Sequence, residues 1–115
     1  MALSEIEVKR VEKAANKFMA NRRPPEHIRS QLDIGWRLDS QSIYIFEIRP
    51  VWNNPSDVQK LDIAKATFVR TQGVWKVYWM RQDLKWHAYE PDSRVKSADQ
   101  FFEVVDKDEF CCFFG

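Results

Sequence analysis

The chain has 115 residues, and 18 lysines and arginines against 17 aspartates and glutamates give a formal net charge of +1. This balance argues against general electrostatic attraction to nucleic acid or to a membrane surface. Hydrophobic residues make up 44% of the chain, which is sufficient for one core, so residues 1–115 are expected to form a single domain. The N-terminus lacks the apolar segment of a secretory signal, which predicts a cytoplasmic protein.

The two cysteines are adjacent, at Cys111 and Cys112. Neighbouring cysteines do not readily form an ordinary disulfide with each other, and two thiols do not supply the ligands of a zinc site. We therefore expect small, reduced side chains, and we predict no metal site and no cofactor.

A helix is expected to begin at Ser4, because Ser4 and Glu7 have the spacing of a capping box. Apolar residues then recur at the spacing of one helix face: Val8, Val11, Ala15 and Phe18. A basic stripe follows another face and consists of Arg10, Lys13 and Lys17. The helix should end near Asn21, because Pro24 and Pro25 cannot continue it.

Two strands should follow the helix. Apolar and polar residues alternate over 32–39, which is typical of a strand with one solvated face. Residues 43–50 are mostly apolar on both faces, which predicts an interior strand that ends at Pro50. Residues 51–57 have the composition of a turn-rich connection, which we expect to pass into a short helical turn before Leu61.

The next three strands are expected to form successive hairpins with tight turns at Gln72-Gly73 and Gln82-Asp83. These turns determine which residues share a face. One predicted face is the core and contains Ala64, Ala66, Phe68, Trp75, Val77, Trp79, Trp86 and Ala88. The other predicted face contains Lys65, Thr67, Val69, Lys76, Tyr78, Met80, Lys85, His87 and Tyr89.

A second capping box, at Ser97 and Gln100, predicts a second helix, and residues 108–115 form either a short strand or a docked tail. The predicted fold class is therefore α+β: an N-terminal helix, an antiparallel sheet of about five strands arranged as a β-meander, and a second helix. Both helices should cover the tryptophan face, which leaves the lysine face open to solvent.

The open face suggests a binding module. Ammonium groups there could hold phosphates while bases stack on the rings, so an anionic, nucleotide-like or single-stranded nucleic-acid ligand is the natural class. The candidate ligand-binding residues are Lys65, Lys76, Tyr78, Lys85, His87 and Tyr89. The ordinary alternative is a solvated sheet surface. If the face binds nucleic acid, the basic stripe of the first helix should lie near it.

Two other classes of function remain open. Asp33 and Glu47 with Arg49 resemble the acidic pair and cation of a metal-dependent phosphodiesterase, although Glu47 and Arg49 could equally form a structural ion pair. His87 near Asp83 could act as a general base, or it could be structural. The apolar tail or an exposed sheet edge could also support a homodimer.

Several segments together resemble one family over nearly the whole chain: RRPPEHIR, FEIRPVW, KATFVRTQGVWKVYW, DLKWHAYEP and CCFFG. They are similar to small bacterial proteins grouped as domain of unknown function 3024. The resemblance implies a bacterial, cytoplasmic, single-domain protein. It implies no established activity that could be assigned to any residue.

Overall fold

The computed structural model of the chain describes residues 3–114. The elements follow the order α1 (Glu5–Arg22), β1 (Asp33–Asp39), β2 (Ser42–Val51), β3 (Asn54–Val69), β4 (Val74–Met80), β5 (Trp86–Ala88), the 3₁₀ turn η1 (Glu90–Asp92), β6 (Arg94–Val95) and α2 (Ala98–Lys107). None of the helices in this part of the chain is long and apolar enough to cross a membrane.

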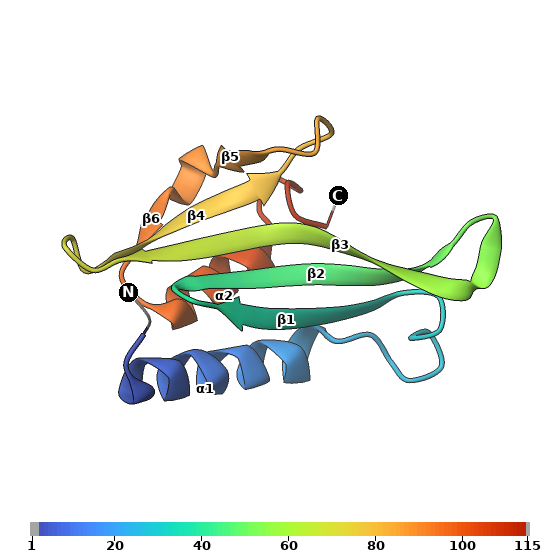
Figure 1. Cartoon of the computed structure of the whole chain (residues 1–115), viewed down its shortest axis with the longest axis horizontal. Helices are drawn as coiled ribbons and strands as arrows, with labels where there is room; N and C mark the ends of the chain where they lie inside the picture. Colours follow the sequence, from blue (N-terminus) through green and yellow to red (C-terminus); the bar gives the residue numbers. More distant parts are fainter. Residues whose placement is uncertain (1–2, 115) are drawn as a thin grey trace.

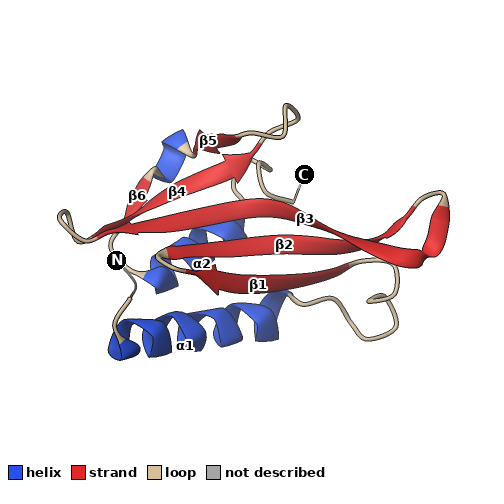
Figure 2. Ribbon diagram, in the orientation of Figure 1, coloured by secondary structure: helices blue, strands red, loops and turns tan. Residues whose placement is uncertain are grey.

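The strands form one antiparallel sheet in the order β1-β2-β3-β4-β5, and β6 pairs with β4 beside β5. Both helices contribute to a core on one face of this sheet, and α2 lies behind the strands in Figure 1. Within residues 3–114, neither α-helix lies on the opposite face (Figure 2). We call it the open face, and we call the covered side the helix face. The predicted α+β fold is thus confirmed.

The capping box at the start of α1 forms as the sequence predicts. The Ser4 hydroxyl accepts a hydrogen bond from the Glu7 amide at 3.2 Å, and the Glu7 carboxylate accepts one from the Ser4 amide at 2.8 Å. The buried side of α1 consists of small and apolar residues that pack into the core: Val11, Ala14, Ala15 and Phe18.

The core contains the helix-face residues of β2, β3 and β4, as their alternation predicts. Trp75 is only 5% exposed, and Phe68 packs against it with ring centroids 5.1 Å apart. Fully burying an aromatic side chain of this size contributes about 2–3 kcal/mol, so this pair strongly favours the observed faces of β3 and β4. The connection between these strands is longer than the predicted tight turn, because Val69 pairs with Val74.

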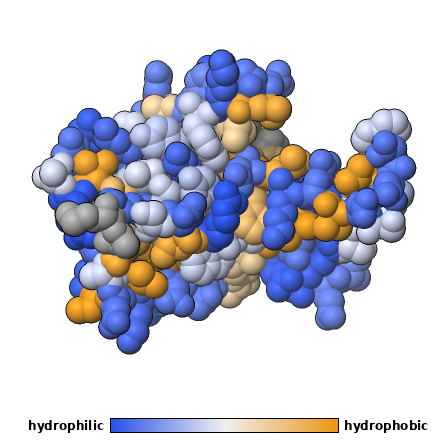
Figure 3. All heavy atoms as spheres, in the orientation of Figure 1, coloured by the Kyte–Doolittle hydropathy of each residue, from blue (hydrophilic) through white to orange (hydrophobic). Residues whose placement is uncertain are grey.

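The prediction of a loop at 51–57 is wrong. Val51 pairs with Asn54, and β3 begins at Asn54, so β2 and β3 continue as a two-stranded arm that projects from the body (Figure 1). Neither face of the arm is buried, and a strand without a buried face lacks the alternating pattern by which strands are recognised. Trp52, at the tip, is 89% exposed, and apolar residues are visible along the arm in Figure 3.

The predicted register of β5 is also wrong. Met80 pairs with Trp86, so the loop between β4 and β5 contains five residues, 81–85, instead of the tight turn expected at Gln82-Asp83. Leu84 takes a left-handed conformation with φ of 61°, and its amide donates to the Arg81 carbonyl at 2.9 Å. Because the loop has an odd number of residues and the predicted turn has an even number, each side chain of β5 points to the face opposite the one predicted.

The tail after α2 folds back onto its own chain. Asp108 ends α2 in a left-handed conformation, and its two carboxylate oxygens accept hydrogen bonds from the amides of Phe113 and Phe114, each at 3.0 Å. Phe113 is buried against Tyr89, and the Arg22 guanidinium lies 4.2 Å from the centre of the Phe114 ring. The docked tail, one of the two predicted alternatives, is therefore the one observed.

Candidate ligand-binding face of the sheet

The open face brings three cross-strand neighbours into line on β2, β3 and β4. Tyr44 pairs with Lys65, and Lys65 pairs with Tyr78. Because paired residues of antiparallel strands point to the same side, the lysine is flanked by two tyrosines. The reversed register of β5 adds Trp86 to the same side, where its ring lies 6.1 Å from that of Tyr44.

The Lys65 ammonium lies among these three rings. Its nitrogen is 5.4 Å from the centroid of Tyr78 and 5.7 Å from the centroids of Tyr44 and Trp86. These distances fall within the range of cation–π attraction, which holds a cation over an aromatic face. Within residues 3–114, Lys65 forms no ion pair with a carboxylate. A positive charge is therefore fixed on the sheet without a neutralising partner.

Arg37 is the second cation beside Tyr44, but its charge is compensated. Its guanidinium stacks 4.2 Å from the Tyr44 centroid and donates two hydrogen bonds to the Asp62 carboxylate, at 2.7 and 3.0 Å. This bidentate contact with Asp62 raises the pKa of Arg37 above its ordinary value. Arg37 thus fixes the position of Tyr44, while the net positive charge comes from Lys65.

A shallow hollow of about 210 Å³ lies next to Tyr78, where β5 and β6 diverge along β4. Lys76 and Arg94 are cross-strand partners that line it, together with Tyr78 and Ser93. Neither cation forms an ion pair with any residue in 3–114. Figure 3 shows hydrophilic residues, in blue, beside pale residues of intermediate hydropathy on this side of the molecule.

The structure brings three of the predicted binding residues, Lys65, Lys76 and Tyr78, to the open face. Lys85 lies in the exposed β4–β5 loop. The placement of His87 on this face is wrong, because it pairs with Trp79 and points to the helix face. The placement of Tyr89 there is also wrong, because its side chain is buried against the tail.

Sequence reasoning missed Tyr44, Trp86 and Arg94. The alternation of β2 contained a signal for Tyr44. Ile43 and Ile45 on either side of it are fully buried in the core, so Tyr44 between them must point to the opposite face. The apolar character of both faces of β2 concealed that signal. Trp86 was assigned to the core, and only the length of the β4–β5 loop places it on the open face.

The acidic constellation proposed for a phosphodiesterase does not form. Asp33 pairs with Ile48 and Glu47 pairs with Ile34, so the two carboxylates point to opposite faces. The guanidinium of Arg23 binds Asp33 at 2.9 and 3.0 Å, and this contact lowers the pKa of Asp33. Residues 3–114 contain no cluster of three metal-ligating His, Cys, Asp or Glu side chains.

His87 contacts Asp83 as the sequence suggests, at 2.8 Å between Nε2 and Oδ2. This hydrogen bond lowers the pKa of Asp83. The residue opposite His87 is Trp79. The α1 stripe of Arg10, Lys13 and Lys17 belongs to a helix on the covered side, so it does not extend the open face.

The fold and the open face together define a small α+β protein with a meander sheet, one face of which is cationic and aromatic. The chain matches the family described as a domain of unknown function, DUF3024, over residues 3–115, and it belongs to that family. Comparisons with curated proteins and with solved structures gave no match.

Proposed function

We propose that the open face binds an anionic ligand that carries a planar ring, with a single-stranded nucleic acid or a nucleotide as the natural class. The observation that carries this proposal is the position of the Lys65 ammonium among Tyr44, Tyr78 and Trp86. A phosphate that reaches this ammonium displaces no protein carboxylate, so its binding costs no existing ion pair.

The spacing of cations and rings supports a ligand with several phosphates and bases. Lys65 lies on β3 beside Tyr78 of β4, and Lys76 and Arg94 line the hollow on the other side of Tyr78. Positive charges on both sides of a ring suit a strand whose phosphates alternate with stacked bases. Stacking contributes about 1–3 kcal/mol per base and does not depend on sequence.

The proposal can be tested by fluorescence anisotropy with labelled oligothymidine and oligouridine at low and moderate salt. We expect binding that weakens as salt increases. The Lys65→Gln/Lys76→Gln variant should bind at least about tenfold more weakly, with a shallower dependence on salt. The matched control is Lys13→Gln/Lys17→Gln, which removes the same charge from exposed positions on α1.

Two results would overturn the proposal. One is that the wild-type protein binds neither oligonucleotide nor nucleoside triphosphates at low salt. The other is that the open-face and α1 variants lose affinity equally, which would indicate attraction to total charge and not to this face. Thermal unfolding of each variant establishes that its fold is retained.

A second candidate function is self-association through β1. This strand is an edge of the sheet and is paired along its seven residues with β2 alone, whereas β5 and β6, at the other side, have three and two residues. Long regular edges accept a neighbouring strand readily. Sedimentation equilibrium tests this candidate: a dimer that forms as the concentration rises would support it, and a wild-type protein that is monomeric at all concentrations would exclude it.

A further inference from the structure

A separate pocket of about 510 Å³ lies between two segments of the chain. One segment contains η1 and β6, and the other contains α2 and the start of the tail. Its volume falls in the usual range of small-molecule sites. Six charged side chains line it, three of each sign: Asp92, Glu103, Glu109, Arg94, Lys96 and Lys107. None of the six takes part in an ion pair with any residue in 3–114.

Tyr89 is the buried polar residue of this pocket. Its side chain is 2% exposed, and its hydroxyl has no hydrogen-bond partner among residues 3–114. No buried side-chain oxygen or nitrogen in that range lacks a partner, so the hydroxyl of Tyr89 is not completely buried. Tyr89 is one of the residues that line the pocket, and the hydroxyl is the polar group of its side chain.

The surroundings of Tyr89 favour a cationic group. Burial raises the pKa of Tyr89, and the nearby acidic groups of Cys112, Asp108, Asp92 and Glu109 raise it further. Tyr89 shares the pocket with the carboxylates of Asp92 and Glu109, and a phenol oxygen can accept a hydrogen bond from an ammonium group. Arg94 lies in β6, Lys96 directly follows it, and Lys107 is the last residue of α2; cations of this kind can hold a carboxylate.

Backbone hydrogen bonds and one ring contact hold the framework of the pocket. The Tyr89 amide donates to the Val77 carbonyl at 2.9 Å, and its ring packs against Phe113 with centroids 4.7 Å apart. Asp108 holds the tail through two backbone amides, and the Gln100 side chain accepts a hydrogen bond from the Lys96 amide at 2.7 Å. A preformed framework lowers the cost of ordering the loop when a ligand binds.

From this arrangement we infer that the pocket binds a small zwitterion, such as a free amino acid or a short peptide. Its ammonium group lies at Tyr89, Asp92 and Glu109, and its carboxylate lies at Lys96 and Lys107. Val95 and Val104 supply the apolar contact for a side chain. The charges of the lining residues sum to zero, which matches a ligand that carries one charge of each sign.

The test is a titration of the isotope-labelled full chain with glycine, dialanine and trialanine, followed by heteronuclear NMR. We expect saturable shifts of amides within residues 89–109. N-acetyl-dialanine and dialanine amide each lack one charge and should bind about tenfold more weakly or worse. Tyr89→Phe keeps the ring and removes the hydroxyl, so it should weaken binding, whereas Tyr78→Phe on the open face should not.

Lys107→Gln provides a second variant, because it changes an exposed residue and leaves the core intact. It should weaken binding of dialanine but not of its amide. The inference is overturned if none of the three zwitterions shifts residues 89–109 at millimolar concentration, or if the blocked peptides bind as well as dialanine. Arg94 lines both this pocket and the open-face hollow, so neither variant is placed there.

Discussion

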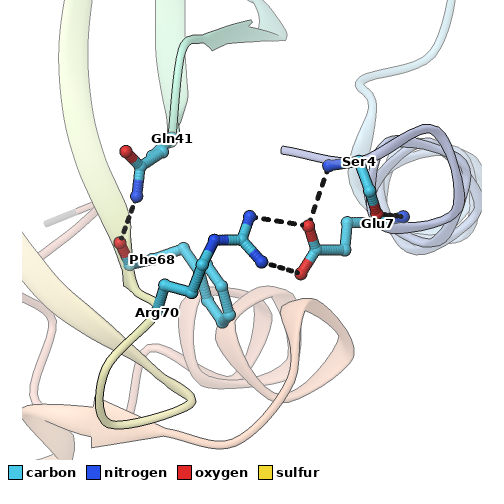
Figure 4. A network of polar contacts seen from close by, with 5 residues as sticks. All are labelled: Ser4, Glu7, Gln41, Phe68 and Arg70. Atoms are coloured by element: carbon cyan, nitrogen blue, oxygen red, sulfur yellow. Dashed lines mark hydrogen bonds and ion pairs between the residues drawn. The ribbon is translucent and has the colours of Figure 1, made fainter. Parts of the chain in front are cut away.

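The Arg70 guanidinium contacts the Glu7 carboxylate, 63 positions earlier in the chain, at 2.9 and 3.3 Å (Figure 4). The same carboxylate accepts the Ser4 amide, so one side chain both caps α1 and joins it to the connection between β3 and β4. Arg70 also lies 5.3 Å from the centroid of Phe68. A helix cap and a tertiary contact therefore depend on a single ionised group.

This contact predicts how stability depends on pH. The hydrogen bond from Arg70, with that from the Ser4 amide, lowers the pKa of Glu7 from 4.5 to about 2. A carboxylate with a depressed pKa in the folded state stabilises fully above its unfolded value, and this stabilisation disappears as the pH falls toward the folded value. Thermal unfolding should therefore show a loss of stability between pH 4.5 and about 2 that involves Glu7.

The Glu7→Gln variant should be less stable than wild type at neutral pH and should approach it near pH 2. Glu12→Gln is the control, because Glu12 is an exposed residue of the same helix without an ion pair among residues 3–114. Equal melting temperatures for Glu7→Gln and Glu12→Gln at neutral pH would contradict this role of Glu7.

Gly35 should not tolerate a side chain. A Cβ at this position would lie 2.7 Å from two carbons of the Phe46 ring, which covers it from the paired strand. Gly35→Ala should therefore reduce the free energy of unfolding by about 1–3 kcal/mol, the usual cost of overpacking. Denaturant unfolding measures this change, and the additional substitution Phe46→Leu should restore part of the loss. A neutral Gly35→Ala would show that the ring moves freely.

The tryptophans should differ sharply in their contribution to stability. Trp75→Ala should cost about 3–5 kcal/mol, because the buried ring packs against Phe68. Trp52→Ala, at the tip of the arm, should change the free energy of unfolding by less than about 0.5 kcal/mol. Denaturant titrations of both variants would detect the difference, and a costly Trp52→Ala would mean that the arm packs against something in solution.

Asp108 should hold the tail in place. Asp108→Ala removes the two carboxylate oxygens that accept hydrogen bonds from the Phe113 and Phe114 amides. It also places alanine in a left-handed conformation with φ of 40°, which alanine adopts less readily than aspartate. We expect a loss of about 1–3 kcal/mol, and a smaller loss for Asp108→Asn, because asparagine tolerates this conformation and keeps one acceptor. Hydrogen exchange at the two phenylalanine amides should accelerate in both variants, and unchanged exchange would exclude this mechanism.

Local patterns predicted α1 and the faces of β3 and β4 correctly. The capping box at Ser4 depends on residues three apart, and the faces of these strands follow from the burial of Trp75 and Val77. Such features need only information from neighbouring positions. The arm was missed for the complementary reason, because strands that bury neither face leave no periodic pattern in the sequence.

The candidate site was predicted in part. Lys65, Lys76 and Tyr78 lie on the open face because alternation along β3 and β4 places them opposite the core. Trp86 and His87 exchange sides because the β4–β5 loop contains five residues and not the two of the predicted turn, and this loop includes the left-handed Leu84, whose amide donates to the Arg81 carbonyl. A leucine with positive φ is unusual, and nothing in the local sequence indicates it.

The sequence by itself determined which segments are helical, which alternate, and which cations belong to β3 and β4, since these properties depend on spacing along the chain. Tertiary structure alone decided that Trp86 joins Lys65 and that Tyr89 turns away to line a second pocket. The physical reason is that alternation specifies faces only relative to a register. The register of β5 depends on the length of the β4–β5 loop, and the position of Tyr89 depends on the tail that Asp108 holds.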